Sequence, residues 1–168
     1  DMLLPGAIQA VLDVFDGDTS YQWVAGRCRV IDAEGREIRR VVTWYKNLLL
    51  RFHSFPLLLA ECYLSAMAVF FKRGIYEESG PHDLDKTTEY DLWLKFARKH
   101  PLKRLSRYLA CFRVHSESDT GSFRAFPAKR ALETALRHGI GHPVASGIAR
   151  LNYYRLVAAY SIMNRLLK

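Results

Sequence analysis

Glu89 and Asp91 are the two carboxylates best placed for proton transfer, because they follow a polar loop and begin a predicted helix. A carboxylate can act as a general base when it lies within hydrogen-bonding reach of the proton that it removes. Residues two apart on a helix do not face each other, so we expect different roles for them, one directed into a cleft and the other capping the helix. The alternative is structural, because acidic residues are common in the first turn of helices.

His115 lies just after a predicted strand and opens a polar loop, where a histidine can bind a metal or a phosphate. The alternative is a solvated or capping histidine. Asp1 could supply an oxygen ligand, but a lone carboxylate does not by itself indicate a site. Trp93 could stack on a sugar, although its place on an apolar helix face is more typical of a core residue.

The elements that must position these side chains follow from hydrophobic periodicity. Apolar residues at helical spacing predict helices, over residues 5–16, 88–100, 127–138 and 143 to about 167, with a shorter one over 74–79. Alternating or continuous apolar runs predict strands over residues 22–31, 38–44, 65–71 and 108–114. Residues 32–35, with glycine last, predict a tight hairpin turn, so that 38–44 is the return strand or a short extension leading outward. The run 65–71 fits a central strand buried on both faces. Residues 47–59 are apolar but irregular and are interrupted by Pro56, so we expect a helical turn and a loop there. This order predicts an α/β fold with a mixed sheet flanked by helices and a helical C-terminal tail.

Composition indicates a globular protein with a basic surface. The 168 residues are 49% hydrophobic and 25% charged, with a net charge of +8, a balance that favours anionic partners such as phosphorylated substrates, anionic lipid or nucleic acid. The three cysteines form no CxxC pair, so neither a zinc site nor a disulfide framework is indicated, and a reducing, cytoplasmic location fits. No apolar run is long enough to span a bilayer.

Five segments, in order along the chain, resemble the motifs of family 2 glycosyltransferases, which have the GT-A fold. They are DMLLPGA (1–7), GRCRVIDAEG (26–35), AVFFKRGIYEESG (68–80), EYDLWLKFA (89–97) and FRVHSES (112–118). The first resembles the end of the family's D-D-x-x-x-P-G-A stretch, and the last resembles y-R-v-H-x-x-S. The ordered combination, over residues 1–120, carries the resemblance.

The resemblance implies an inverting transferase that moves a sugar from a nucleoside-diphosphate sugar to an acceptor hydroxyl in polysaccharide or glycoconjugate synthesis. Asp1 matches the last aspartate of the DXD motif and would bind a divalent metal, Mg²⁺ or Mn²⁺, with His115 near the metal or the diphosphate. Glu89 matches the catalytic base, Asp91 is the second candidate, and Trp93 would contact the acceptor. The nucleotide-binding half would precede Asp1, so the chain is expected to be a C-terminal portion that is inactive alone.

Three positions depart from the family pattern. Glu89 stands where aspartate is usual, Lys95 where arginine is usual, and Arg27 where aspartate is usual. Glutamate can still act as a base, but a lysine cannot make the bidentate contacts of an arginine.

Residues 121–168 form an extension outside the motif match. Residues 151–168 predict a helix that packs back over the domain, with a basic amphipathic helix on the inner face of an anionic membrane as the alternative. His138 and His142 are four residues apart, but the glycines and the proline between and after them argue against a metal site.

Two other function classes remain open. A basic module for nucleic acid or anionic membrane would explain the net charge, although no nucleic-acid-binding motif is present, so nucleic acid is not the expected partner. An inactive, transferase-like scaffold would explain the departures at Glu89 and Lys95.

Overall fold

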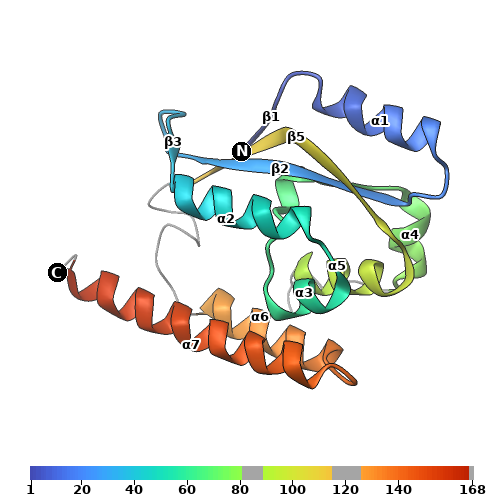
Figure 1. Cartoon of the computed structure of the whole chain (residues 1–168). Helices are drawn as coiled ribbons and strands as arrows, with labels where there is room; N and C mark the ends of the chain where they lie inside the picture. The colour runs from blue at the N-terminus through green and yellow to red at the C-terminus, as the bar shows by residue number, and fades with distance from the viewer. Residues whose placement is uncertain (81–88, 115–125, 167–168) are drawn as a thin grey trace.

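The computed structural model describes residues 1–80, 89–114 and 126–166 and consists of a mixed β-sheet flanked by helices (Figure 1). The predicted α/β class is therefore confirmed.

Five strands of the described chain form one sheet, in the order β1-β5-β2-β3, with β4 also paired to β2. They are β1 (Met2–Leu3), β2 (Trp23–Ile31), β3 (Glu37–Ile38), β4 (Val69–Phe71) and β5 (Leu102–Arg113). The two long strands β2 and β5 run parallel, whereas the short strands pair antiparallel, β1 with β5 and both β3 and β4 with β2. The parallel pair thus forms the centre of the sheet.

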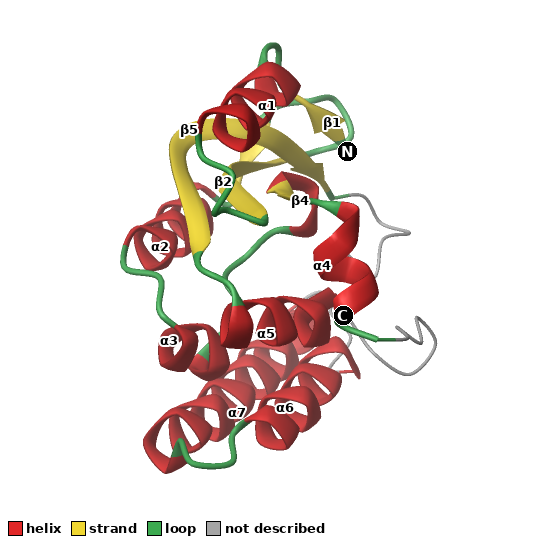
Figure 2. Cartoon of the chain, turned by 90° about the vertical axis from the view of Figure 1, so that its right-hand side faces the viewer, coloured by secondary structure: helices red, strands yellow, loops and turns green. Residues whose placement is uncertain are grey.

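The helices lie in layers on the two faces of the sheet. They are α1 (Ala7–Gly17), α2 (Arg40–Arg51), α3 (Phe55–Ala60), the 3-10 turn η1 (Ala66–Ala68), α4 (Arg73–Glu78), α5 (Glu89–Lys99), α6 (Phe126–His138) and α7 (Pro143–Leu166). Helix α1 covers one face, while α2, α3 and α5 lie on the other side, with α6 and α7 as a further layer beneath them (Figure 2).

The central strands approach each other closely at Gly26. A Cβ at this position would lie 2.3 Å from Cγ of Leu109 and 3.1 Å from the carbonyl oxygen of Arg107. The register between β2 and β5 also shifts twice between Ala25 and Cys28, as at a β-bulge. A glycine is therefore required at the point where the strand bends.

Buried apolar side chains form two clusters. The larger one joins the sheet to α3, α5, α6 and α7 and includes the fully buried Trp23 and Phe96. The smaller one joins the sheet to α1 and includes Val11 and Leu109. Because alternate residues of a strand point to opposite faces, one sheet supports both clusters.

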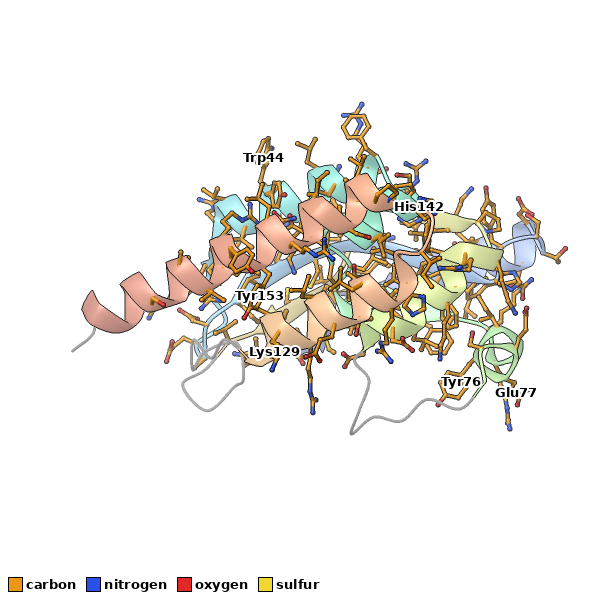
Figure 3. All side chains as sticks on the ribbon, turned by 90° about the horizontal axis from the view of Figure 1, so that it is seen from below. Trp44, Tyr76, Glu77, Lys129, His142 and Tyr153 are labelled. Atoms are coloured by element: carbon orange, nitrogen blue, oxygen red, sulfur yellow. The ribbon has the colours of Figure 1, made fainter. Side chains whose placement is uncertain are left out.

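The predicted return strand over residues 38–44 is wrong beyond its first residue. β3 ends at Ile38, and α2 begins at Arg40. The apolar residues that suggested a strand are on the solvent side of this helix, since Val41 is 78% exposed and Trp44 is 64% exposed. Figure 3 shows the Trp44 side chain projecting away from the molecule.

Three further boundaries differ from the predictions. Residues 65–71 form a strand only from Val69, because the preceding residues form η1. The helical turn expected within residues 47–59 is present as α3, whereas residues 47–51 belong to α2. Pro56 stands in the first turn of α3, where proline is favoured, and the Ser54 hydroxyl caps that helix by accepting from the Leu57 N–H. β5 begins at Leu102, six residues earlier than expected.

The first half of α7 packs back onto the domain. Ala145 and Ala149 of α7 and Ala135 of α6 belong to the larger cluster. The Asn152 side chain donates a hydrogen bond to the carbonyl oxygen of Ala60 at 3.0 Å. Across the described ranges, none of the helices has the length and apolar character required to cross a membrane.

Candidate functional site

Asp1 lies at the end of the sheet, where its Oδ1 accepts a hydrogen bond from the backbone N–H of Arg113 at 2.8 Å. β1 follows Asp1 directly and pairs with β5 (Figure 1). This pairing holds the Asp1 carboxylate beside the end of β5. The Arg113 guanidinium donates to the carbonyl oxygens of Asp32 and Ala33, at 2.9 and 2.5 Å. Residues from three distant segments therefore meet at one end of the sheet.

The turn at this end of the sheet is the one that its sequence predicts. Gly35 has φ of +87°, a conformation that favours glycine, and its N–H donates to the carbonyl oxygen of Asp32 at 3.2 Å. The Asp32 carboxylate accepts from the Arg36 N–H at 2.7 Å. The turn is thus closed by local hydrogen bonds and attached to β5 by Arg113.

Glu89 is the first residue of α5, and its side chain is exposed. The next residue, Tyr90, is buried, and its hydroxyl lies within hydrogen-bonding distance of the carbonyl oxygens of Leu58 and Leu59, at 2.8 and 2.9 Å. Burial raises the pKa of the nearby Cys62 thiol to about 11, and the negative charge of Glu89 contributes to the same shift. Glu89 is therefore an accessible carboxylate on a firmly attached helix start.

Asp91 has the opposite environment, since it is only 3% exposed. Its Oδ1 lies 2.8 Å from Nε2 of His138 and 3.6 Å from the Arg137 guanidinium, and its Oδ2 lies 3.0 Å from the Lys95 ammonium. Burial by itself would raise the pKa of Asp91, but the hydrogen bonds from His138 and Lys95 outweigh it and hold the pKa below its usual value. This carboxylate joins α5 to α6.

Trp93 lies in the core rather than on a surface. It is 4% exposed, its ring stacks on Trp23 with centroids 6.3 Å apart, and it also contacts Phe71 and Phe96. The ring is therefore not accessible to an acceptor sugar in this structure, and Trp93 is placed as a core residue.

His115 lies outside the described residues. Among the side chains that are described, no group of three or more His, Cys, Asp or Glu is arranged to hold a metal ion. The Asp1 carboxylate is exposed, and its oxygens are of the type that Mg²⁺ and Mn²⁺ prefer, so it fits the role of one ligand in a larger set.

Three residues important to this arrangement did not stand out in the sequence. Arg113 was seen only as part of a motif, and His138 was considered only as a metal ligand. Glu61 accepts hydrogen bonds from Tyr45 at 2.7 Å and from Arg155 at 3.2 Å, which joins α2 to α7. All of these contacts join residues more than ten positions apart, so no local pattern could have indicated them.

No family model matches the chain, and no curated protein matches it.

Proposed function

We propose that this chain is part of a glycosyltransferase that moves a sugar from a nucleoside-diphosphate sugar to an acceptor hydroxyl, with inversion at the transferred carbon. The observation that carries the proposal is the meeting of Asp1, Arg113 and the Asp32 turn at one end of the sheet. These three come from separate segments that resemble family 2 glycosyltransferases. The fold assigned under this proposal is the GT-A fold.

Glu89 is the proposed general base. Its exposed carboxylate begins α5 and can accept the proton of an acceptor hydroxyl while that oxygen attacks the anomeric carbon from the face opposite the leaving diphosphate. The anchored Tyr90 side chain holds the start of the helix in place, so the carboxylate has a defined position.

Asp91 is proposed to position α5 rather than to accept the proton. Its carboxylate is buried and already accepts hydrogen bonds from His138 and Lys95. This pairing also gives a role to Lys95, where the family has arginine, because a lysine four residues after an aspartate forms a favourable helical pair.

Asp1 would hold a divalent cation together with the donor diphosphate. Such a cation, when bound, stabilises the negative charge that develops on the leaving nucleoside diphosphate. The role of the chain itself is to orient the Asp1 carboxylate through the Arg113 N–H, which occupies one of its two oxygens.

The test uses the protein at its full natural length, titrated by calorimetry with UDP and GDP in the presence and absence of Mn²⁺. We expect Mn²⁺-dependent binding of one of them, weakened at least tenfold by Asp1→Asn. Asp16→Asn, which changes an exposed aspartate on α1, is the matched control and should leave the affinity unchanged. No binding of any nucleoside diphosphate by the folded protein would reject the proposal.

The role of the base is tested separately with Glu89→Gln. We expect nucleotide affinity to persist while release of UDP or GDP from a panel of nucleotide sugars falls by about 10²- to 10⁴-fold. Full activity in Glu89→Gln would remove Glu89 from the mechanism.

Peripheral attachment of α7 to an anionic membrane is a second candidate role. Val144, Ile148 and Leu151 are exposed along one side of this helix, and Arg150 is exposed nearby. An apolar stripe with adjacent arginines suits the boundary of an anionic bilayer. Sedimentation with vesicles of phosphatidylglycerol and with vesicles of phosphatidylcholine should show binding to the former only, reduced by Leu151→Ser.

A further inference from the structure

Helix α2 turns apolar side chains to solvent and neutral polar side chains to the sheet, the opposite of what surface helices usually do. The helix lies along β2 (Figure 1), and on its inner side Thr43 is only 4% exposed. The side turned away from the sheet, called here the α2 outer face, carries apolar and aromatic residues at spacings of three and four. They are Val41, Trp44, Tyr45, Leu48 and Phe52.

The α2 outer face is open to solvent over much of its length. Val41 is 78% exposed, and Trp44 and Phe52 are 64% exposed each. The Trp44 side chain projects away from the molecule (Figure 3). Adjoining apolar side chains that remain exposed mark surfaces that bind another protein or a membrane. The α2 outer face is therefore a candidate docking surface.

The charge around this surface is positive. Residues 38–60 contain four basic side chains and no acidic one. The basic residues are Arg39, Arg40, Lys46 and Arg51. Helix α7, which borders the α2 outer face, also contains arginines and no acidic residue. This part of the surface is therefore complementary to a partner that carries negative charge.

Two arginines lie directly against the aromatic rings of the α2 outer face. The guanidinium carbon of Arg51 is 5.8 Å from the centre of the Phe52 ring, and that of Arg155 in α7 is 6.0 Å from the centre of the Tyr45 ring. The carboxylate of Glu61 also contacts Tyr45, but it is paired with Arg155 at 3.2 Å. Cationic and apolar groups are thus interleaved on one surface.

The polar groups of the α2 outer face are few. A specific protein–protein interface carries about one hydrogen bond for each 100–200 Å² of buried surface. The side chains of the α2 outer face offer two polar atoms, and one of them, the Tyr45 hydroxyl, already donates to Glu61 at 2.7 Å. The other is the indole nitrogen of Trp44, and tryptophan is enriched where membranes meet water. A second copy of the chain would bring like charges together. These features favour a lipid surface over a protein partner.

We propose that the α2 outer face docks on an anionic membrane surface. Trp44 and Phe52 enter the boundary between headgroups and acyl chains, while Arg40 and Arg51 pair with lipid phosphates. The proposal does not depend on sugar transfer, because no residue of this face is assigned to that reaction. It shares its partner with the attachment proposed for α7, and the variants below distinguish the two helices.

Trp44 allows the contact to be observed directly, because Trp23 and Trp93 are buried in the core. The 168-residue chain is titrated with phosphatidylglycerol vesicles while tryptophan fluorescence is recorded. We expect the emission to move to shorter wavelengths and to be quenched when the acyl chains carry bromine, whereas phosphatidylcholine vesicles have no effect. The absence of binding to phosphatidylglycerol, or binding in sedimentation without any change in emission, would overturn the proposal.

Trp44→Phe identifies the source of the signal, since this variant should sediment with the vesicles but show no emission shift. Trp44→Ser should weaken sedimentation about tenfold, because it removes the apolar group that enters the bilayer. The matched control is Leu12→Ser in α1, on the other side of the sheet (Figure 2), which should bind as the wild type does. If Leu151→Ser abolishes binding and Trp44→Ser leaves it unchanged, α7 alone attaches to the membrane and the proposal for α2 is rejected.

Charge reversal tests the role of the arginines. Arg51→Glu should weaken binding to phosphatidylglycerol vesicles by about fivefold or more. Arg73→Glu in α4 changes the net charge by the same amount at a side chain that is 89% exposed, and it should have a much smaller effect. Equal losses in the two variants would show that only the overall charge attracts the vesicles, which would contradict the contact assigned to Arg51.

The lipid-free chain provides the remaining test. Light scattering should show a monomer whose tryptophan emission does not change with protein concentration. A dimer whose formation moves the Trp44 emission to shorter wavelengths would assign the α2 outer face to a second copy of the chain, and would overturn the proposal.

Discussion

The Nε2 atom of His138 lies 2.8 Å from Oδ1 of Asp91, and this contact joins residues 47 positions apart in the sequence. His138 is the last residue of α6, and Asp91 is in the first turn of α5. The imidazole therefore connects the extension after residue 120 to the helix that begins with Glu89. Any change at Asp91 acts on the way these two helices pack, whatever reaction the site performs.

Replacement of Asp91 should destabilise the fold. Asp91→Ala leaves His138 and Lys95 without their shared acceptor, and we expect the free energy of unfolding to fall by about 2 kcal/mol, measured by urea denaturation at pH 7. Glu89→Gln changes an exposed carboxylate of the same helix and should alter stability by less than about 0.5 kcal/mol. Equal effects of the two substitutions would contradict the different roles assigned to them.

Asp91 should also contribute to acid sensitivity. Its pKa is lowered in the folded protein, so its stabilising contribution is present above the ordinary value of 3.8 and is lost as the pH falls below that value. The difference in unfolding free energy between wild type and Asp91→Asn should therefore shrink between pH 5 and pH 2. A difference that stays constant over this range would show that the charge of Asp91 does not stabilise the fold.

His53 should make stability depend on pH in a higher range. Burial, together with the charge of Arg104, lowers the pKa of His53 from 6.5 to about 4. Between these values the unfolded chain binds a proton that the folded chain does not, so stability falls as the pH decreases from 6.5 to 4.

His53→Gln should reduce that slope, because glutamine does not titrate but can keep the hydrogen bond that Nδ1 makes with the Tyr63 hydroxyl at 2.6 Å. The measurement is urea denaturation of both proteins at several pH values from 4 to 7. If the unfolding free energies of wild type and variant change in parallel with pH, His53 is not the source of the pH dependence.

Gly26→Ala should be strongly destabilising, because its Cβ would overlap the buried Leu109 side chain where β2 meets β5. We expect a loss of about 2 kcal/mol or more in the free energy of unfolding. Gly147→Ala is the matched control, since a Cβ there meets nothing within 4 Å and the residue lies inside α7. It should stabilise the protein by about 0.5–1 kcal/mol. If both substitutions destabilise the protein equally, the close contact between Gly26 and Leu109 is not the cause of the loss.

Arg113→Lys should loosen the turn after β2. A lysine cannot place two N–H donors on the Asp32 and Ala33 carbonyl oxygens as the guanidinium does. Amide hydrogen exchange at Gly35 and Arg36 should become about tenfold faster, with little change in the core. Arg36→Lys, at an exposed position in the same turn, should leave these exchange rates unchanged. Equal exchange rates in the wild type and both variants would show that Arg113 does not stabilise the turn.

Local sequence patterns predicted the helices and the turn that are specified by residues close together in the sequence. The helices α1, α5, α6 and α7 lie within two residues of their predicted bounds, because the spacing of apolar residues over a few turns is sufficient to specify them. The glycine turn at Asp32–Gly35 was found for the same reason.

Helix α2 shows where such patterns fail. The β-branched run Val41, Val42, Thr43 favours a strand. In the structure these apolar side chains are largely exposed, whereas the polar Thr43 faces the sheet. The surface against which α2 packs decides which of its faces is buried. Among the described strands, β3 pairs with β2 over only two residues, so this pairing ends before residues 41–43.

In the candidate site, too, some features were indicated by the sequence and others were determined only by the tertiary structure. The sequence alone marked Asp1, Glu89 and Asp91 as carboxylates that could do chemistry and placed the last two at a helix start. Only the tertiary structure set Asp1 against Arg113, left Glu89 exposed, and buried Asp91 against His138. Exposure, hydrogen-bond partners and the direction of a pKa shift depend on residues far away in the chain, and those distances are closed by packing of the whole fold rather than by the propensities of any one segment.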